Sequence, residues 1–113
     1  MQRTEIYILC VLYNDTIKNI RSLKNFEKII ENNENIRLVI SDNSTKNEIV
    51  NYNKNYKLSP GMKYIHNGGN IGLTAAYNIA IGKIRREINK SDQDCFVWFT
   101  DDDTWFSEED LEN

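Results

Sequence analysis

Four short apolar runs, separated by longer segments with helical periodicity, constrain the fold of this chain more than any other feature. The apolar runs are expected to form strands, and they cover residues 6–13, 36–40, 62–65 and 96–100. Apolar side chains recur at roughly helical spacing between these runs, over 17–30, 44–56 and 73–87. Alternating strands and helices imply a parallel sheet with right-handed crossovers. The sequence therefore predicts an α/β fold with a central, mostly parallel sheet of about four strands flanked by helices.

The size and composition of the chain limit it to one small domain. With 113 residues, of which 40% are hydrophobic, it can form a single core, and we treat 1–113 as one domain. The net charge of -3, with acidic and basic residues interspersed, argues against a nucleic-acid partner. No apolar run is long enough to span a bilayer. The sequence therefore predicts a cytoplasmic protein, with attachment of a full-length protein to the inner membrane face left open.

The fourth apolar run leads directly into three consecutive carboxylates, Asp101, Asp102 and Asp103. Ligands of open α/β sheets bind just beyond the carboxyl ends of the strands, so this acidic triplet is a candidate site. Side chains alternate between faces along an extended chain, which places Asp101 and Asp103 on the same side. Two converging carboxylates suit a hard divalent cation, Mg²⁺ or Mn²⁺. The alternative is a solvated acidic turn, because Asp is common in turns.

The second apolar run ends in a similar polar segment, Ser-Asp-Asn-Ser at 41–44. Its place at a strand end makes Asp42 a second candidate for ligand binding. The alternative is a helix cap, in which Ser44 or Thr45 pairs with Glu48 in a capping box. Asparagine is abundant here and through residue 55. We attribute this abundance to mutational bias in the source genome and draw no function from it.

A glycine-rich turn, Asn-Gly-Gly-Asn-Ile-Gly at 67–72, links the third apolar run to the third helical segment. It departs from the dinucleotide fingerprint G-x-G-x-x-G, because Asn67 stands at the first glycine position. The Walker pattern is absent, since the chain contains no Gly-Lys-Ser or Gly-Lys-Thr. A phosphatase-type D-x-D-x-T site starting at Asp101 would require threonine at position 105, where the chain has Trp105. These three readings therefore receive little support from the residues.

Taken together, these segments resemble the nucleotide-sugar-binding part of the family 2 glycosyltransferases, which have the Rossmann-like GT-A fold. The resemblance covers essentially the whole chain and is closest to the rhamnosyltransferase-like branch that builds surface polysaccharides. It rests on Tyr13-Asn14 after the first run, the 41–44 segment, the block N-x-G-N-x-G-x-x-x-A-x-N over 67–78, and the D-x-D pattern at 101–103. The implied fold is a GT-A half-domain.

The resemblance implies a metal-dependent glycosyltransferase that takes a sugar from a UDP- or dTDP-sugar and transfers it to a polysaccharide or glycoconjugate acceptor. Asp103 is implied as the direct ligand of Mn²⁺ or Mg²⁺, while Asp101 faces the ribose and the metal. Asp42 is expected to accept a hydrogen bond from the imide N–H of a uracil or thymine ring. Tyr13 and Asn14 are expected to border the same base.

Three further residues receive donor-binding roles from the resemblance. Gly72 permits close approach of the backbone to the diphosphate, and Asn70 positions the turn. The helix that begins after this turn favours negative charge at its N-terminus. Asp102 is expected to strengthen the local field as a neighbour of the metal ligand.

The catalytic base is unknown, and the resemblance implies that it lies beyond residue 113, together with the site for a glycan or lipid-linked acceptor. The chain alone is therefore expected to be inactive in transfer, and exposed apolar surface is expected to favour self-association. Two alternatives remain open from the residues. One is a non-catalytic nucleotide-binding or assembly module of the same fold, and the other is a phosphatase-like or other Mg²⁺-dependent enzyme.

Overall fold

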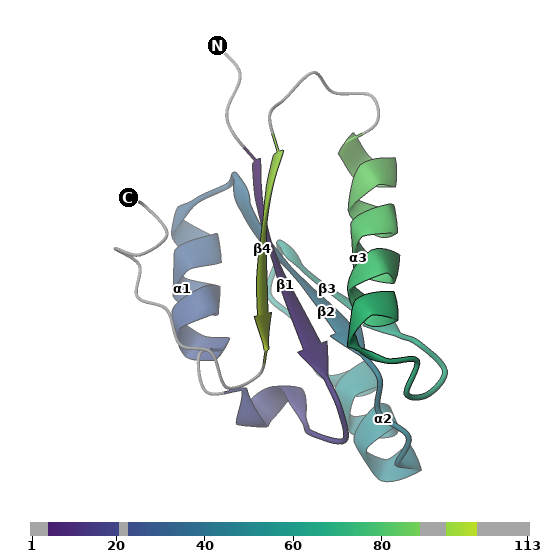
Figure 1. Cartoon of the computed structure of the whole chain (residues 1–113). Coiled ribbons are helices and arrows are strands. Elements are labelled where there is room, and N and C mark those ends of the chain that lie inside the picture. Colours follow the sequence, from purple (N-terminus) through teal and green to yellow (C-terminus); the bar gives the residue numbers. More distant parts are fainter. Residues whose placement is uncertain (1–4, 21–22, 89–94, 102–113) are drawn as a thin grey trace.

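The computed structural model of the chain describes residues 5–20, 23–88 and 95–101 (Figure 1). Strands and helices alternate as the sequence predicts, and the α/β class is confirmed. The elements are β1 (Glu5–Leu12), the 3₁₀ helix η1 (Ile17–Asn19), α1 (Leu23–Asn32), β2 (Ile36–Asp42), α2 (Asn47–Asn55), β3 (Met62–His66), α3 (Leu73–Ile88) and β4 (Cys95–Asp101). Each strand agrees with its predicted apolar run to within two residues.

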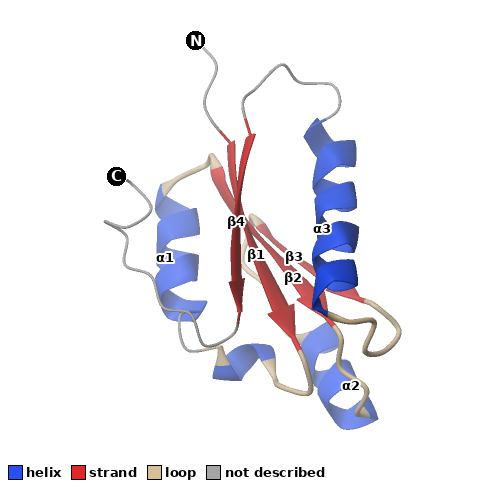
Figure 2. Cartoon of the chain, viewed as in Figure 1, coloured by secondary structure: helices blue, strands red, loops and turns tan. Residues whose placement is uncertain are grey.

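The four described strands form one sheet in the order β3-β2-β1-β4, with every neighbouring pair parallel. After β1 the chain builds outward on one side through β2 and β3, and then returns to place β4 on the other side of β1 (Figure 2). The strand order therefore reverses between β1 and β4. In open α/β sheets, this reversal marks the crevice where ligands bind.

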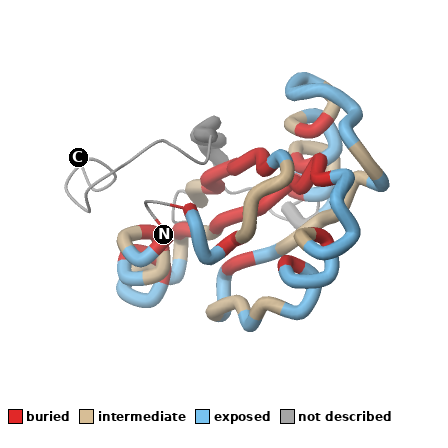
Figure 3. The backbone as a smooth tube through the Cα atoms, turned by 90° about the horizontal axis from the view of Figure 1, so that it is seen from below, coloured by how far each residue is buried: buried red, intermediate tan, exposed pale blue. Residues whose placement is uncertain are grey.

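The sheet separates two apolar layers, which explains why β1 and β2 read as continuous apolar runs. Alternate side chains of these strands pack toward η1 and α1 on one face and toward α3 on the other. Figure 3 shows the buried backbone running through the middle of the molecule, between helices with exposed outer faces. The buried residues of the α1 side are Ile8, Cys10, Leu12, Ile17, Ile20, Leu23, Phe26, Ile29, Ile30, Ile36, Leu38, Ile40 and Met62. Those of the α3 side are Tyr7, Leu9, Val39, Ala80 and Ile84.

The predicted helix over 17–30 is wrong in its first part. The structure has the short helix η1 followed by Ile20 in an extended conformation, with φ -64° and ψ 115°, and α1 begins at Leu23. Ile17 and Ile20 are both buried, as are the apolar positions of α1. The periodicity of buried residues therefore continues across a break in the helix, which is why the pattern suggested one element.

None of the helices in the described part of the chain is long and apolar enough to cross a membrane.

Two glycines offer a test of the backbone conformation, Gly61 before β3 and Gly82 in α3. Gly61 has φ +92°, and a Cβ added there would lie 2.7 Å from Cγ2 of Ile30. Gly82 lies within α3 and has open space around it. We expect Gly61→Ala to lower the free energy of unfolding by about 1–3 kcal/mol through backbone strain and crowding. Gly82→Ala should raise it by about 0.5–1 kcal/mol, because Gly is unfavourable inside a helix.

Urea denaturation of both variants would measure these changes. A neutral or stabilising effect of Gly61→Ala would contradict the left-handed conformation at residue 61.

Candidate functional site

The carboxyl ends of the strands meet at one edge of the sheet. Asp42, the last residue of β2, lies opposite Leu12 of β1 and opposite His66 of β3. The backbone of Asp101, at the end of β4, lies opposite Val11 of β1. All four strands therefore end at nearly the same level, at the lower edge of the sheet in Figure 1.

This edge also holds the polar residues that are buried in the described part of the chain. They lie at the end of β2, in the segment that follows it and in α2, and they are Ser41, Asp42, Asn43, Ser44 and Asn53. Burying polar groups is costly unless they are hydrogen-bonded, so such a concentration at one edge indicates a built network.

The structure brings most of the predicted donor-binding residues to this edge. They are Tyr13, Asn14, Asp42, Asn70 and Gly72, together with the backbone of Asp101. Asp102 and Asp103 lie outside the described residues. The metal-binding roles of Asp101 and Asp103 therefore remain predictions. Within the described ranges, no group of three or more His, Cys, Asp or Glu side chains could hold a metal ion.

Asp42 is the centre of the network. Its side chain is fully buried, with 0% relative exposure. Its Oδ1 accepts hydrogen bonds from the backbone N–H of Ser44 at 2.9 Å and from the Ser44 hydroxyl. Its Oδ2 accepts from Asn53 Nδ2 at 3.0 Å and from the Tyr64 hydroxyl. A carboxylate has about four lone-pair sites, so protein donors fill the acceptor capacity of Asp42. A hydrogen bond from a nucleotide base would have to replace one of them.

Asn14 connects the end of β1 to the start of α2. Its backbone is left-handed, with φ 49°, a conformation that Asn tolerates better than most residues. Its Oδ1 accepts from the backbone N–H groups of Thr45 at 2.8 Å and Lys46 at 3.0 Å. Its own N–H donates to Ser44 Oγ at 2.8 Å. Asn14 therefore binds the segment directly before α2, about thirty residues away in the chain.

The capping box expected from Ser44 or Thr45 with Glu48 does not form. The N-cap of α2 is Lys46, which makes no side-chain capping bond. Ser44 instead donates to Asp42 and accepts from Asn14, while Asn14 accepts from the backbone N–H of Thr45. The local pattern was misleading because Ser44 and Thr45 bind residues distant in the chain and the helix begins after Lys46.

The glycine-rich turn over 67–72 lies next to this network. Gly68, Gly69 and Gly72 all have positive φ, and a Cβ added to any of them would meet no atom within 4 Å. Their requirement for glycine therefore comes from backbone conformation, and open space lies beside the turn. The Gly72 N–H donates to Asn70 Oδ1 at 3.1 Å, which closes the turn just before α3 begins. Asn70 therefore closes the turn through its side chain.

Amide side chains tie this turn to the end of β2. Asn43 Nδ2 donates to the Gly72 carbonyl at 3.1 Å, and Asn67 Nδ2 donates to Asn43 Oδ1 at 2.9 Å and to Ser41 Oγ at 2.8 Å. The Ser41 hydroxyl in turn donates to the Ala76 carbonyl of α3 at 2.9 Å. The turn and the N-terminus of α3 are therefore held in a defined position against the sheet.

Tyr64 is held as a hydrogen-bond donor to Asp42. Burial raises the pKa of the Tyr64 hydroxyl well above its usual value, and the hydrogen bond to Asp42 and the negative charge of Asp42 raise it further. The hydroxyl therefore remains protonated over the physiological pH range and continues to donate.

Four members of this network received no role from the sequence, and they are Asn43, Asn53, Tyr64 and Asn67. Asn53 lies in a stretch rich in asparagine, and Tyr64 lies within an apolar run, so nothing in the local pattern set either apart. Asn43 and Asn67 lie inside the quoted motifs, but their side-chain partners are 24 to 29 residues away in the chain. Only the folded structure reveals these contacts.

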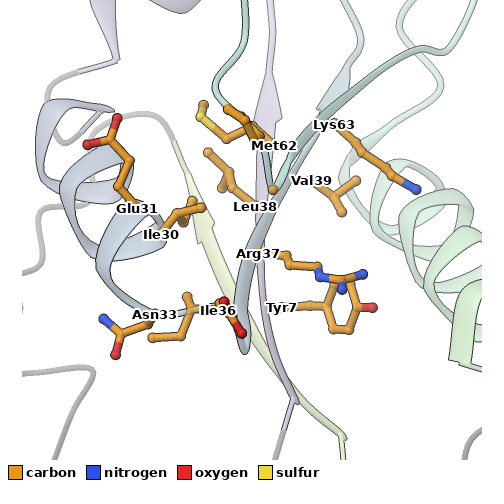
Figure 4. A pocket seen from close by; sticks show the side chains of 13 residues that line it. Tyr7, Ile30, Glu31, Asn33, Ile36, Arg37, Leu38, Val39, Met62 and Lys63 are labelled. Atoms are coloured by element: carbon orange, nitrogen blue, oxygen red, sulfur yellow. The ribbon is translucent and has the colours of Figure 1, made fainter.

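A cavity of about 500 Å³ lies at the opposite edge of the sheet, away from this network (Figure 4). β3 begins at Met62, opposite Leu38, so the first residues of β2 extend beyond it and leave a notch. Apolar side chains, including Ile30 and Met62, line the notch together with charged groups. Figure 4 shows Arg37 beside Tyr7, and its guanidinium carbon lies 6.0 Å from the centre of that ring. None of the predicted site residues lines this cavity.

A parallel sheet with a polar network at its carboxyl edge and a glycine turn before a helix defines an α/β ligand-binding domain of the Rossmann-like class. The family model for glycosyl transferase family 2 matches residues 10–113. The chain therefore belongs to glycosyltransferase family 2. No curated protein and no solved structure matches the chain significantly.

Replacing Asn14 tests how much its side-chain bonds to the segment before α2 contribute to stability. Asn14→Ala removes the acceptor for Thr45 and Lys46 and strains a left-handed backbone, so it should lower the free energy of unfolding by about 1–3 kcal/mol. Asn14→Asp keeps the acceptor, tolerates the same conformation and adds charge that favours a helix N-terminus, so its effect should be small. Urea denaturation would compare the two. Equal losses would show that the hydrogen bonds from Thr45 and Lys46 to Asn14 Oδ1 contribute little.

The raised pKa of Tyr64 predicts how its contribution to stability depends on pH. A tyrosine whose pKa is raised in the folded state stabilises the protein fully below its unfolded pKa of about 10, and this contribution is lost as pH rises above that value. Tyr64→Phe should therefore cost more free energy of unfolding at pH 8 than at pH 11. Urea denaturation of both proteins at each pH would measure the difference. The same cost at both values would show that the ionisation of Tyr64 is not suppressed by folding.

Proposed function

We propose that this chain binds the nucleotide part of a UDP- or dTDP-sugar at the carboxyl edge of the sheet, as the donor-binding part of a metal-dependent glycosyltransferase. We propose that this sugar is transferred in the cytoplasm to a polysaccharide or glycoconjugate acceptor, as in the rhamnosyltransferase-like branch. The observation that carries the proposal is the strand register. It sets the backbone of Asp101 at the same edge as Asp42 and the glycine turn, beside the reversal of strand order.

The base end of the donor is proposed to lie beside Tyr13. Its side chain is 55% exposed, although it follows a strand whose last six residues are all buried. The side chain of the neighbouring Asn14 accepts hydrogen bonds from the N–H groups of Thr45 and Lys46. Asn14 is therefore proposed to support base binding indirectly, by holding the turn in which it lies. The role proposed for Asp42 is to orient the segments whose donors bind its carboxylate. Direct contact with the imide N–H requires one of its present donors to be displaced.

The diphosphate is proposed to lie beside the glycine turn over 67–72. Open space next to Gly68, Gly69 and Gly72 would let a ligand approach the backbone closely. The 16-residue helix α3 begins directly after the turn, and its first N–H groups and its dipole favour negative charge. The Asn70 side chain closes the turn that presents these groups.

Members of this family commonly use a divalent metal ion. The proposal assigns the direct ligand to Asp103, with Asp101 toward the ribose and the metal and Asp102 as a neighbouring charge. Carboxylate oxygens are the ligands that Mg²⁺ and Mn²⁺ prefer, so these residue types fit the ion. When bound, the ion would neutralise the charge that develops on the leaving diphosphate.

No general base is assigned among the described residues. Exposed apolar side chains lie at the start of α3 and along it, and they are Ile71, Leu73 and Ile79. We propose that they favour self-association with a second copy of the chain.

Calorimetric titration with UDP, dTDP and GDP, with and without Mn²⁺, tests this proposal. We expect UDP or dTDP to bind more tightly than GDP, and to bind more tightly when Mn²⁺ is present. Asp103→Asn should remove the gain due to Mn²⁺, because an amide is a weaker ligand than a carboxylate. Glu31→Gln, at an exposed carboxylate of α1 near the opposite edge, is the matched control and should leave that gain intact.

The outcomes separate the parts of the proposal. Nucleotide binding that ignores Mn²⁺ would overturn the metal role of Asp103, and equal binding of GDP would overturn the base preference. The absence of binding by any of the three nucleotides would overturn the proposed function.

A further inference from the structure

Asn53 is an unusual residue for its position. It lies near the end of α2, a helix in which only Val50 and Asn53 are buried, and its relative exposure is 1%. At three residues from Val50, it occupies the inward face where an apolar residue is normally found. An amide buried there is costly unless its donors and its acceptor are paired.

All of the hydrogen-bonding groups of the Asn53 amide are used. Its Oδ1 accepts from the backbone N–H of Ile17 at 2.8 Å. Its Nδ2 donates to the Asp15 carbonyl at 3.0 Å and to Asp42 Oδ2 at 3.0 Å. One amide therefore joins two segments that are distant in the chain, the loop after β1 and the end of β2.

The loop after β1 is consequently held at two places. Asn14 binds the N–H groups of Thr45 and Lys46 directly before α2, and Asn53, near the end of α2, binds both Asp15 and Ile17. Tyr13, which the proposed function places beside the base, directly precedes this loop and is itself exposed. The position of Tyr13 relative to Asp42 thus depends on contacts that α2 makes.

We propose that Asn53 is a positioning residue of the donor site, which fixes the loop after β1 against the Asp42 carboxylate. It acts through Asp15, Ile17 and Asp42 and contacts no ligand itself. The Asn53 amide uses two N–H donors and one oxygen acceptor. No other side chain of similar size could make the same bonds, since an ionised Asp has no N–H donor and Leu has neither donors nor an acceptor. This inference rests on the proposed function for its consequence in donor binding, whereas the fixing of the loop can be measured independently.

The test compares Asn53→Leu, which matches the shape of the amide, with a control at Asn33. Asn33 Nδ2 donates to the Ile29 carbonyl at 2.8 Å near the opposite edge of the sheet, so Asn33→Ala removes a hydrogen bond remote from the site. Asn53→Ala serves as a second variant if the Leu variant does not fold. Each protein is titrated with UDP and Mn²⁺ well below its unfolding temperature, and amide hydrogen exchange of Ile17 is followed without nucleotide.

We expect the Asn53 variants to weaken UDP binding by about tenfold. This is the low end of the loss in affinity found when a residue that supports a binding site is removed. The Ile17 N–H should lose its protection from exchange in these variants. Asn33→Ala should lower the unfolding temperature while leaving UDP affinity and Ile17 protection unchanged.

The inference is overturned if the Asn53 variants bind UDP as the wild type does, or if the Ile17 N–H keeps its protection. If the wild-type chain binds no nucleotide, the proposed function fails and the donor-site role of Asn53 fails with it. In that case the exchange of Ile17 still decides whether Asn53 fixes the loop.

Discussion

The organisation of this molecule depends on the buried carboxylate of Asp42. A buried charge costs several kcal/mol unless it is well paired or hydrogen-bonded, and here the four donors come from Ser44, Asn53 and Tyr64. These donors belong to the segment after β2, to α2 and to β3. The carboxylate can be buried favourably only when all three segments are in place. The order of the functional edge is therefore coupled to the folding of the sheet beneath it.

This coupling divides the residues at the edge into two groups with different tasks. Buried side chains such as Asp42, Asn43 and Asn53 bind other parts of the protein and hold the segments in position. The Tyr13 ring is exposed and open space lies beside the glycines of the turn over 67–72, and the proposed function places the nucleotide there. A site that depends on an accurate arrangement of loops gains from such support, because loops alone are less well positioned than strands. Family 2 membership agrees with a donor site at this edge.

Much of the fold could be predicted because strands buried on both faces appear as continuous apolar runs. The same logic failed at Ile17 and Ile20, which are buried like the residues of α1 although the helix is interrupted between them. Apolar periodicity reports which side chains are buried, and it does not report the backbone conformation that buries them. The capping box at Glu48 failed for a different reason, since Ser44 and Thr45 bind Asp42 and Asn14 and the helix begins only after Lys46.

The sequence by itself determined the α/β class, the positions of the four strands and the segments that carry the candidate site, because hydrophobic pattern and turn residues act locally. Only the tertiary structure decided the strand order β3-β2-β1-β4 and the common level of the strand ends. It also decided that Asp42 is saturated by protein donors and that Asn53 joins it to the loop after β1. These features depend on hydrogen bonds between residues up to 38 positions apart, and such pairings leave no trace in the local pattern of a single sequence.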